Sequence, residues 1–193
     1  MLSGPIKKVE DFKYLGSYIM NSQKDISVRI GIAWASLKKL NCVWKSLLEN
    51  KEKIRLFTSL VQSILLYSCE TWSLTTTLEK RNRISSLDGA RNRMLRYALN
   101  ISWKDHIPNS IVFEGITPIS AVIRERRVRF AGHCLRARDQ PVSRVVLWEG
   151  LGPGRKGNFK TFPKILMEDL FKLNIGEALV VEHIKELALN RKF

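Results

Sequence analysis

The amino-acid sequence predicts a mainly α-helical protein that begins with a short β-hairpin. Apolar residues recur at helical spacing through most of the chain, and the stretch Lys53–Ser73 is apolar around most of its circumference, as a central core helix would be. Aromatic residues on both sides of Gly16-Ser17 indicate two short strands. We therefore expect a hairpin, a helical bundle around Lys53–Ser73, and a basic helical C-terminal region.

The first half of the chain divides into two predicted parts. The hairpin should occupy residues 1–20, with its tight bend at Gly16-Ser17. A helical domain should follow over residues 21–100. Besides the core helix, it should contain an amphipathic helix from Ile26 to Leu48, whose apolar residues recur for six turns, and a third helix from Leu78 to Leu99.

The second half should be helical as well. Residues 101–149 read as a basic region with a short helix at Asn109–Glu114 and a long helix at Pro118–Arg138, which proline opens. Residues 150–158 are rich in glycine and read as a loop. Residues 159–193 should form two nearly neutral helices with a structural role.

Composition narrows the classes of partner. A hydrophobic content of 45% with 26% charged residues is typical of a globular protein, and polar residues interrupt Lys53–Ser73 too often for a membrane span. The net charge of +15 favours nucleic acid or an anionic membrane surface as partner. Residues 76–158 carry 16 basic against 7 acidic residues, mostly arginines. Because arginine binds phosphate in a bidentate manner, we expect a nucleic-acid partner and no membrane.

The cysteines indicate the compartment. Cys42, Cys69 and Cys134 are scattered and odd in number, which argues against a disulfide framework and favours a reducing compartment. The N-terminal residues show no apolar signal segment, so we expect a nuclear or cytoplasmic rather than a secreted protein. Neither paired cysteines nor a His-x-x-x-His spacing supports zinc, and we expect no cofactor.

Two arginine clusters, at 81–96 and 124–138, are the candidate functional sites. Two interpretations stay open: solvated helix faces, or phosphate-binding surfaces. Acidic partners are sparse, with Asp88 in one cluster and Glu125 in the other, and close unneutralised arginines repel one another unless an anion sits there. We favour phosphate binding that is mostly independent of sequence, with Trp103 or His106 available to stack on a base.

Some cations depart from a simple amphipathic pattern. Arg91, Arg124 and Arg127 project into the apolar arcs of their predicted helices. Their stems could cover apolar surface while the charge reaches water, or the break in pattern could mark function. Arg155 and Lys156 lie in the Gly-rich loop, which is either a phosphate-binding nest or a flexible connector.

Six segments resemble, in order, motifs of the C-terminal part of non-LTR (LINE-type) retrotransposon reverse transcriptases. The first reads FKYLG, the third LLYSCETW against the family's LLYGxETW, and the fifth RRVRFAGH against RRLRWLGH. The six segments are Phe12–Gly16, Asp25–Ile30, Leu65–Trp72, Arg93–Asn109, Arg126–His133 and Gly154–Phe162. Six motifs in one order over residues 9–193 make the resemblance specific.

The resemblance implies a primer-grip hairpin, a helical thumb at 21–100 and a basic tail. Primer-grip-like residues would be Phe12, Tyr14, Leu15 and Gly16. The ligand would be an RNA–DNA hybrid or a DNA duplex, held through phosphate contacts. The expected nucleic-acid-binding residues are Arg81, Arg83, Arg91, Arg93, Arg96, Trp103, Lys104, His106, Arg124, Arg126, Arg127, Arg129, His133, Arg136, Arg155 and Lys156.

The sequence also departs from the family. It contains no YADD-type aspartate pair for two catalytic metals, so we expect no polymerase activity from this chain alone. Serine replaces the pattern's glycine at Ser68, and phenylalanine replaces tryptophan at Phe130 and Phe162. A fragment, a degenerate copy or a separately expressed remnant would fit, and a palm domain encoded upstream would be a further partner. The alternatives are a helical protein-interaction module or a decaying retroelement remnant without function.

Overall fold

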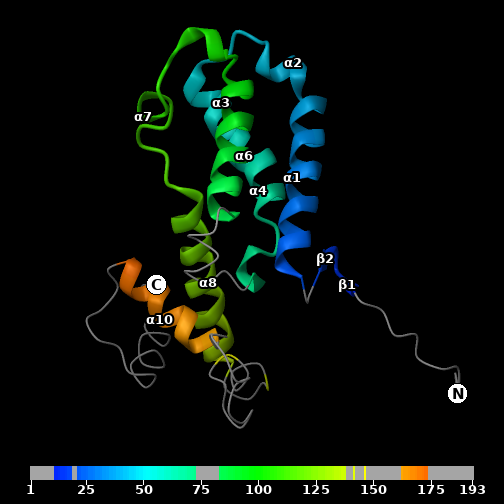
Figure 1. The fold of residues 1–193 in the computed structure, drawn as a ribbon, viewed down its shortest axis with the longest axis vertical. Helices are drawn as coiled ribbons and strands as arrows, with labels where there is room; N and C mark the ends of the chain where they lie inside the picture. The colour runs from blue at the N-terminus through cyan, green and yellow to red at the C-terminus, as the bar shows by residue number, and fades with distance from the viewer. Residues whose placement is uncertain are drawn as a thin grey trace, which may run out of the picture.

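The computed structural model describes residues 11–18, 21–72, 83–137, 141, 146 and 162–173. It is mainly α-helical with a short N-terminal hairpin, as the sequence predicted (Figure 1). Helices α1, α3–α4 and α6 stand side by side, and α8 continues away from them to meet α10 (Figure 1). The loop predicted at 150–158 lies outside the described residues, and of the predicted C-terminal segment 159–193 the structure describes residues 162–173.

The hairpin consists of β1 (Lys13–Tyr14) and β2 (Ser17–Tyr18), paired antiparallel. Lys13 is opposite Tyr18, so the two-residue turn is Leu15-Gly16, one residue earlier than predicted. Both turn residues have positive φ, 46° and 84°, as hairpin turns that match the twist of the strands require. The predicted bend at Gly16-Ser17 rests on the glycine alone, whereas Leu15 also adopts a positive φ and forms the first position of the turn.

The first long helix is shorter than predicted. Helix α1 (Ser22–Lys39) begins at the N-cap Asn21, whose side chain accepts the amide of Lys24. Its regular geometry stops at Leu40, and α2 (Asn41–Trp44) follows as a separate turn. The indole of Trp44 donates to the Leu37 carbonyl at 2.8 Å, which folds the chain back on the end of α1. Leu47 and Leu48, expected in the apolar stripe, are consequently exposed.

The predicted core helix is present but ends early. It runs as α3 (Asn50–Leu56), a π-helical segment η1 (Phe57–Gln62) and α4 (Ser63–Leu65). Its buried side chains Phe57, Val61 and Leu65 face α1 and α6. The helix does not reach Ser73 as predicted, because Ser68 takes a left-handed φ of 61° before the 3-10 turn η2 (Cys69–Thr71).

The third helix of the bundle is α6 (Arg83–Ala98). It ends with Asn100 at a φ of 56°, where the amides of Asn100 and Ile101 bond the carbonyls of Tyr97 and Arg96. This is the arrangement of a Schellman motif with asparagine in the left-handed position. The chain then forms the 3-10 turn η3 (Trp103–Asp105) and the short helix α7 (Asn109–Val112).

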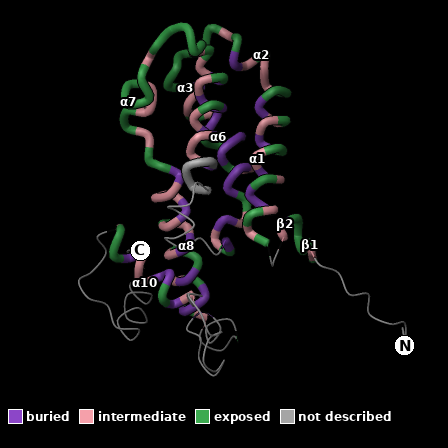
Figure 2. Tube along the Cα trace, viewed as in Figure 1, coloured by how far each residue is buried: buried purple, intermediate pink, exposed green. Residues whose placement is uncertain are grey.

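Helix α8 (Ile119–Arg136) joins two hydrophobic clusters. Its first half, with Ile119 and Ile123, belongs to the core of the bundle. Its second half packs on α10 (Phe162–Lys172) through a smaller cluster, and Figure 2 shows buried positions along both helices. The members of the smaller cluster are Ala131, Cys134, Leu135, Val146, Leu166 and Leu170. In the described part of the chain, no helix is long and apolar enough to cross a membrane.

We predict opposite effects for the same substitution at two glycines. Gly16→Ala should lower the free energy of unfolding by about 1 kcal/mol, because an L-residue is strained at a φ of 84°. Gly31→Ala should raise it by about 0.5–1 kcal/mol, since Gly31 is inside α1 with open space around the added methyl group. Denaturant titration of both variants measures the two changes. A stabilised Gly16→Ala protein would contradict the turn assignment.

We also predict that Ser68→Gly stabilises the protein. The related family pattern has glycine at this position, and the φ of 61° costs a serine roughly 1 kcal/mol. Substitution by glycine should recover part of that energy. The hydrogen bond between the Ser68 and Thr71 hydroxyls, which is lost with the serine side chain, is exposed and therefore contributes little. Ser27→Gly is the matched control: Ser27 lies inside α1, so the same change should destabilise by about 0.5 kcal/mol. Thermal or denaturant unfolding that ranked the two variants the other way would disprove the strain.

Candidate nucleic-acid interface

The hairpin is fixed to the bundle by a buried carboxylate. Asp25, in the first turn of α1, is completely buried. It accepts hydrogen bonds from the Ser17 hydroxyl at 2.8 Å, the Tyr18 amide at 3.2 Å and the Trp72 indole at 2.9 Å. A buried carboxylate is costly unless such donors surround it. The three donors therefore tie β2, α1 and the end of η2 together.

Two further side chains hold the hairpin turn. The Arg29 guanidinium donates to the Gly16 carbonyl and lies 4.2 Å from the centre of the Tyr67 ring. The Tyr67 hydroxyl donates to the Leu15 carbonyl at 2.9 Å. We call Ser17, Asp25, Arg29, Tyr67 and Trp72 the hairpin anchor. It satisfies both carbonyls of the strained turn.

The primer-grip-like residues lie on the outside of this anchor. Phe12, Tyr14 and Leu15 are 54%, 57% and 74% exposed. These three large side chains are therefore accessible to a ligand from outside the bundle. The anchor thus presents an apolar hairpin tip on a rigid base.

The arginines of α6 differ in their accessibility. Arg91 is 4% exposed and donates to the Thr117 carbonyl at 2.7 Å, and burial lowers the pKa of its guanidinium. Arg96 donates to the Asn109 side chain at 2.9 Å and to the Ile107 carbonyl. Arg93 is exposed, and within the described part of the chain its guanidinium bonds the carbonyl of Gly89 in its own helix, at 3.3 Å. Of the three, Arg93 is the one whose guanidinium is free to meet a ligand without loss of a tertiary contact.

The arginines of α8 bind the bundle and α10. Arg126 donates to the Leu66 carbonyl at 3.1 Å, and Arg127 donates to the Trp72 carbonyl at 3.5 Å. Arg127 is 1% exposed, and its Nε lies 2.9 Å from the carboxylate of Asp169, which Arg124 also approaches at 3.8 Å. The carbonyl of Leu66 caps the C-terminal end of α4, and that of Trp72 follows η2, so both arginines hold α8 against the segment after the core helix.

The structure therefore corrects two predicted binding residues. Arg91 and Arg127 were expected to contact phosphate, but both are buried with protein partners, because their stems carry the charge to internal carbonyls rather than to water. Sequence reasoning also took Asp169 as part of a neutral structural helix, whereas it is the buried counter-ion of Arg127.

Other predicted residues remain accessible. Arg129 is exposed and forms a surface pair with Glu125 at 2.7 Å, and His133 and Arg136 lie exposed further along α8. Trp103, Lys104 and His106 are exposed on the η3 turn. The side chains of Arg81, Arg83, Arg155 and Lys156 lie outside the described part of the structure.

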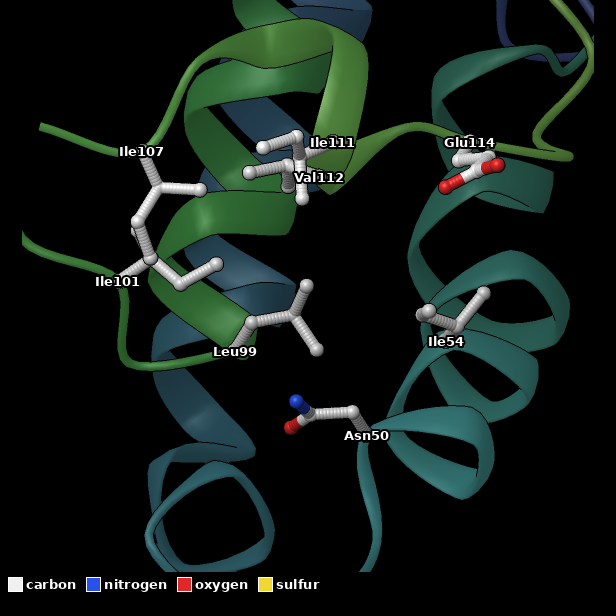
Figure 3. A pocket seen from close by; sticks show the side chains of 8 residues that line it. All are labelled: Asn50, Ile54, Leu99, Ile101, Ile107, Ile111, Val112 and Glu114. Atoms are coloured by element: carbon white, nitrogen blue, oxygen red, sulfur yellow. The ribbon is translucent and has the colours of Figure 1, made fainter.

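An apolar groove lies beneath α7. It has a volume of about 560 Å³, and Figure 3 shows Ile54 of α3 facing Ile107 and Ile111 across it, with Glu114 near one end. Its other lining residues are Asn50, Leu99, Ile101 and Val112. Glu114 is the charged member among the eight.

Among the described residues, no three His, Cys, Asp or Glu side chains converge in a group that could hold a metal ion. Cys42 is exposed, whereas Cys69 and Cys134 are buried. Burial raises the pKa of the Cys69 thiol to about 12 and also raises the pKa of the Cys134 thiol. Neither buried thiol is therefore a good thiolate ligand near neutral pH.

Comparison with curated proteins gives a relative of transposon origin. The chain is similar to a Caenorhabditis elegans protein described as a putative uncharacterized transposon-derived protein, with 26% identity over 140 residues. The match covers 68% of this chain and 48% of the relative, so the chain spans about half the length of the curated relative it matches. No protein-family model matches the sequence, and no solved structure matches it significantly. The similarity is consistent with a transposon-related origin.

We predict that the hairpin anchor carries much of the stability. Asp25→Ala should lower the free energy of unfolding by about 2–4 kcal/mol, because the Ser17, Tyr18 and Trp72 donors lose a buried acceptor. Asp11→Ala is the matched control. The Asp11–Lys24 pair is largely solvated, so its loss should change the free energy of unfolding far less than the loss of Asp25. Equal losses in urea titration would show that Asp25 does not anchor the hairpin.

Proposed function

We propose that the chain is a non-catalytic nucleic-acid-binding region that corresponds to the thumb and C-terminal part of a LINE-type reverse transcriptase. One observation carries the proposal: three segments that resemble family motifs meet in the hairpin anchor. The first segment accepts hydrogen bonds through its Gly16 carbonyl from Arg29 of the second and through its Leu15 carbonyl from Tyr67 of the third, and Arg29 lies over the Tyr67 ring. A shared contact network is a physical reason for these motifs to occur together.

The hairpin would act on the primer end. Phe12, Tyr14 and Leu15 project from a base that Asp25 and Arg29 hold in place. An exposed aromatic and aliphatic tip suits contact with sugars and base edges at a duplex end, where stacking is available. This is the role of a primer grip in the related family.

The phosphate contacts would come from the accessible cations. Arg93, Arg129 and Arg136 are exposed, and the chain carries a net charge of +15. Such contacts bind an RNA–DNA hybrid or a DNA duplex with little dependence on base sequence. The proposal assigns no polymerase chemistry to this chain, because its sequence lacks the family's palm aspartate pair; a separate palm domain would supply it.

A helical protein-interaction module is the second candidate. It is favoured by the apolar groove between α3 and α7, whose volume and mainly aliphatic lining would accept apolar side chains of another protein. It is also favoured by the internal use of Arg91, Arg96 and Arg127, which leaves fewer arginines for phosphate. Salt dependence separates the two candidates.

We predict that exposed arginines set the salt dependence of duplex binding. In Arg93→Gln/Arg129→Gln, the two lost phosphate contacts should reduce the slope of log affinity against log salt by roughly 0.9 each. The reduction should be the same for hybrids of different sequence, since phosphate contacts do not read bases. Fluorescence anisotropy over a salt series measures the slope, and circular dichroism checks the fold.

Lys38→Gln/Lys39→Gln is the control with the same change of net charge. Both lysines are exposed at the end of α1, outside the predicted interface. Their loss should leave the slope unchanged. Equal slope changes in the two double variants would mean attraction by net charge alone. If the parent protein shows no salt-sensitive binding to the duplex, the protein-interaction module replaces nucleic-acid binding as the proposed function.

A further inference from the structure

We infer that the turn Ser102–His106 is a stacking platform for an unpaired nucleobase, with the Trp103 indole as its surface and Arg96 as the residue that positions it. The inference rests on the proposed nucleic-acid binding and adds the ligand class for this turn: a nucleotide that is not base-paired. Trp103 is 79% exposed, the largest exposed aromatic surface on α6 and the segment that follows it among the described residues.

The turn is rigid although it lies on the surface. The Ser102 hydroxyl accepts the Lys104 amide at 3.3 Å, and the Asp105 carboxylate accepts the Ser102 amide at 2.7 Å, which together form a capping box. His106 ends the turn with a left-handed φ of 49°. An indole on such a turn loses little conformational freedom when a base stacks on it.

Arg96 connects the turn to the bundle. Its guanidinium donates through Nε and Nη2 to the Asn109 side chain, at 3.1 and 2.9 Å, and also to the Ile107 carbonyl. At the other end of the segment, the Asn100 side chain donates to the Trp44 carbonyl at 2.6 Å. Both ends of the segment that carries Trp103 are therefore fixed on α2 and α6.

The charge on the turn favours a base over a phosphate. Lys104 and the Asp105 carboxylate are adjacent and cancel, so the turn itself offers an aromatic face rather than a positive field. Arg93 lies one helical turn before Arg96 on α6 and is exposed, so it can meet the phosphate of a nucleotide whose base stacks nearby.

The surroundings of Trp103 favour a base over a protein partner. Within the turn, Ser102, Lys104, Asp105 and His106 are all exposed and polar, and the apolar groove begins at the flanking residues Ile101 and Ile107. A protein interface needs a contiguous core of buried side chains, whereas one aromatic ring within a polar surface matches the area of one base. Recognition by stacking tolerates any base, which agrees with binding that does not depend on sequence.

The test compares an RNA–DNA hybrid with blunt ends and the same hybrid with a short single-stranded end. The parent protein should bind the second more tightly, with quenching of tryptophan fluorescence. Trp103→Ala should weaken binding of the single-stranded end by about 5- to 150-fold and leave the blunt hybrid and the salt slope unchanged. Trp103→Phe should keep most of the affinity. Phe171→Ala, which removes another exposed aromatic side chain, should change neither affinity.

Arg96→Lys tests positioning. It keeps the charge but loses the planar fork that holds Asn109 and Ile107. The preference for the single-stranded end should fall while the salt slope stays the same. In the Trp103→Ala background, Arg96→Lys should cause no further loss, because the two residues act through one contact. Additive losses would assign Arg96 a separate phosphate contact and overturn its positioning role.

The outcomes separate this inference from the proposed function. Salt-sensitive binding with equal affinity for both hybrids, unaffected by Trp103→Ala, would overturn the stacking platform and leave phosphate binding intact. An effect of Trp103→Ala on both hybrids alike would also overturn it. Absence of salt-sensitive binding in the parent protein would overturn both.

Discussion

The hydrogen bonds to the buried Asp25 carboxylate hold the hairpin and the helical bundle in one arrangement. Its donors come from β2 and from Trp72, which lies 47 residues away in sequence. Because an unpaired carboxylate is so costly in the interior, the folded state is favoured only when all three segments are in place. The contacts of Arg29 and Tyr67 with the hairpin turn depend on that placement.

Internal carbonyls explain why so basic a chain can pack its arginines. The sequence argument held that arginines with few acidic neighbours need an external anion. Arg126 and Arg127 instead donate to the carbonyls of Leu66 and Trp72, near the point where the core helix breaks. Leu66 caps the C-terminus of α4, where partial negative charge favours a cation, and Arg127 is also paired with the Asp169 carboxylate. Part of the positive charge is therefore structural, and the accessible remainder is smaller than composition suggests.

Helical periodicity was enough to predict the fold class and most helices, but not where they break. The pattern of α1 continues in sequence to Leu48, yet regular geometry stops at Leu40 because the Trp44 indole bonds the Leu37 carbonyl. The pattern of the core helix likewise continues beyond Ser68, whose left-handed backbone ends it. Both breaks depend on contacts formed only in the folded chain, which a periodic pattern cannot contain. The resemblance contained one signal of the break at Ser68, since the family pattern has glycine at this position.

The candidate site could be predicted only in part, because the contacts that bury some of its arginines also form only in the folded chain. Sequence reasoning identified Arg91, Arg124 and Arg127 as unusual, but it did not separate the buried Arg91 and Arg127 from Arg93 and Arg129, which are exposed. An arginine whose guanidinium hydrogen-bonds a loop or a helix end cannot also bind a phosphate without loss of a tertiary contact. The residues outside that internal network are therefore those whose substitution should change binding alone. Stability and ligand binding are assigned to different arginines of the same helices, and this separation makes the proposed interface accessible to mutation.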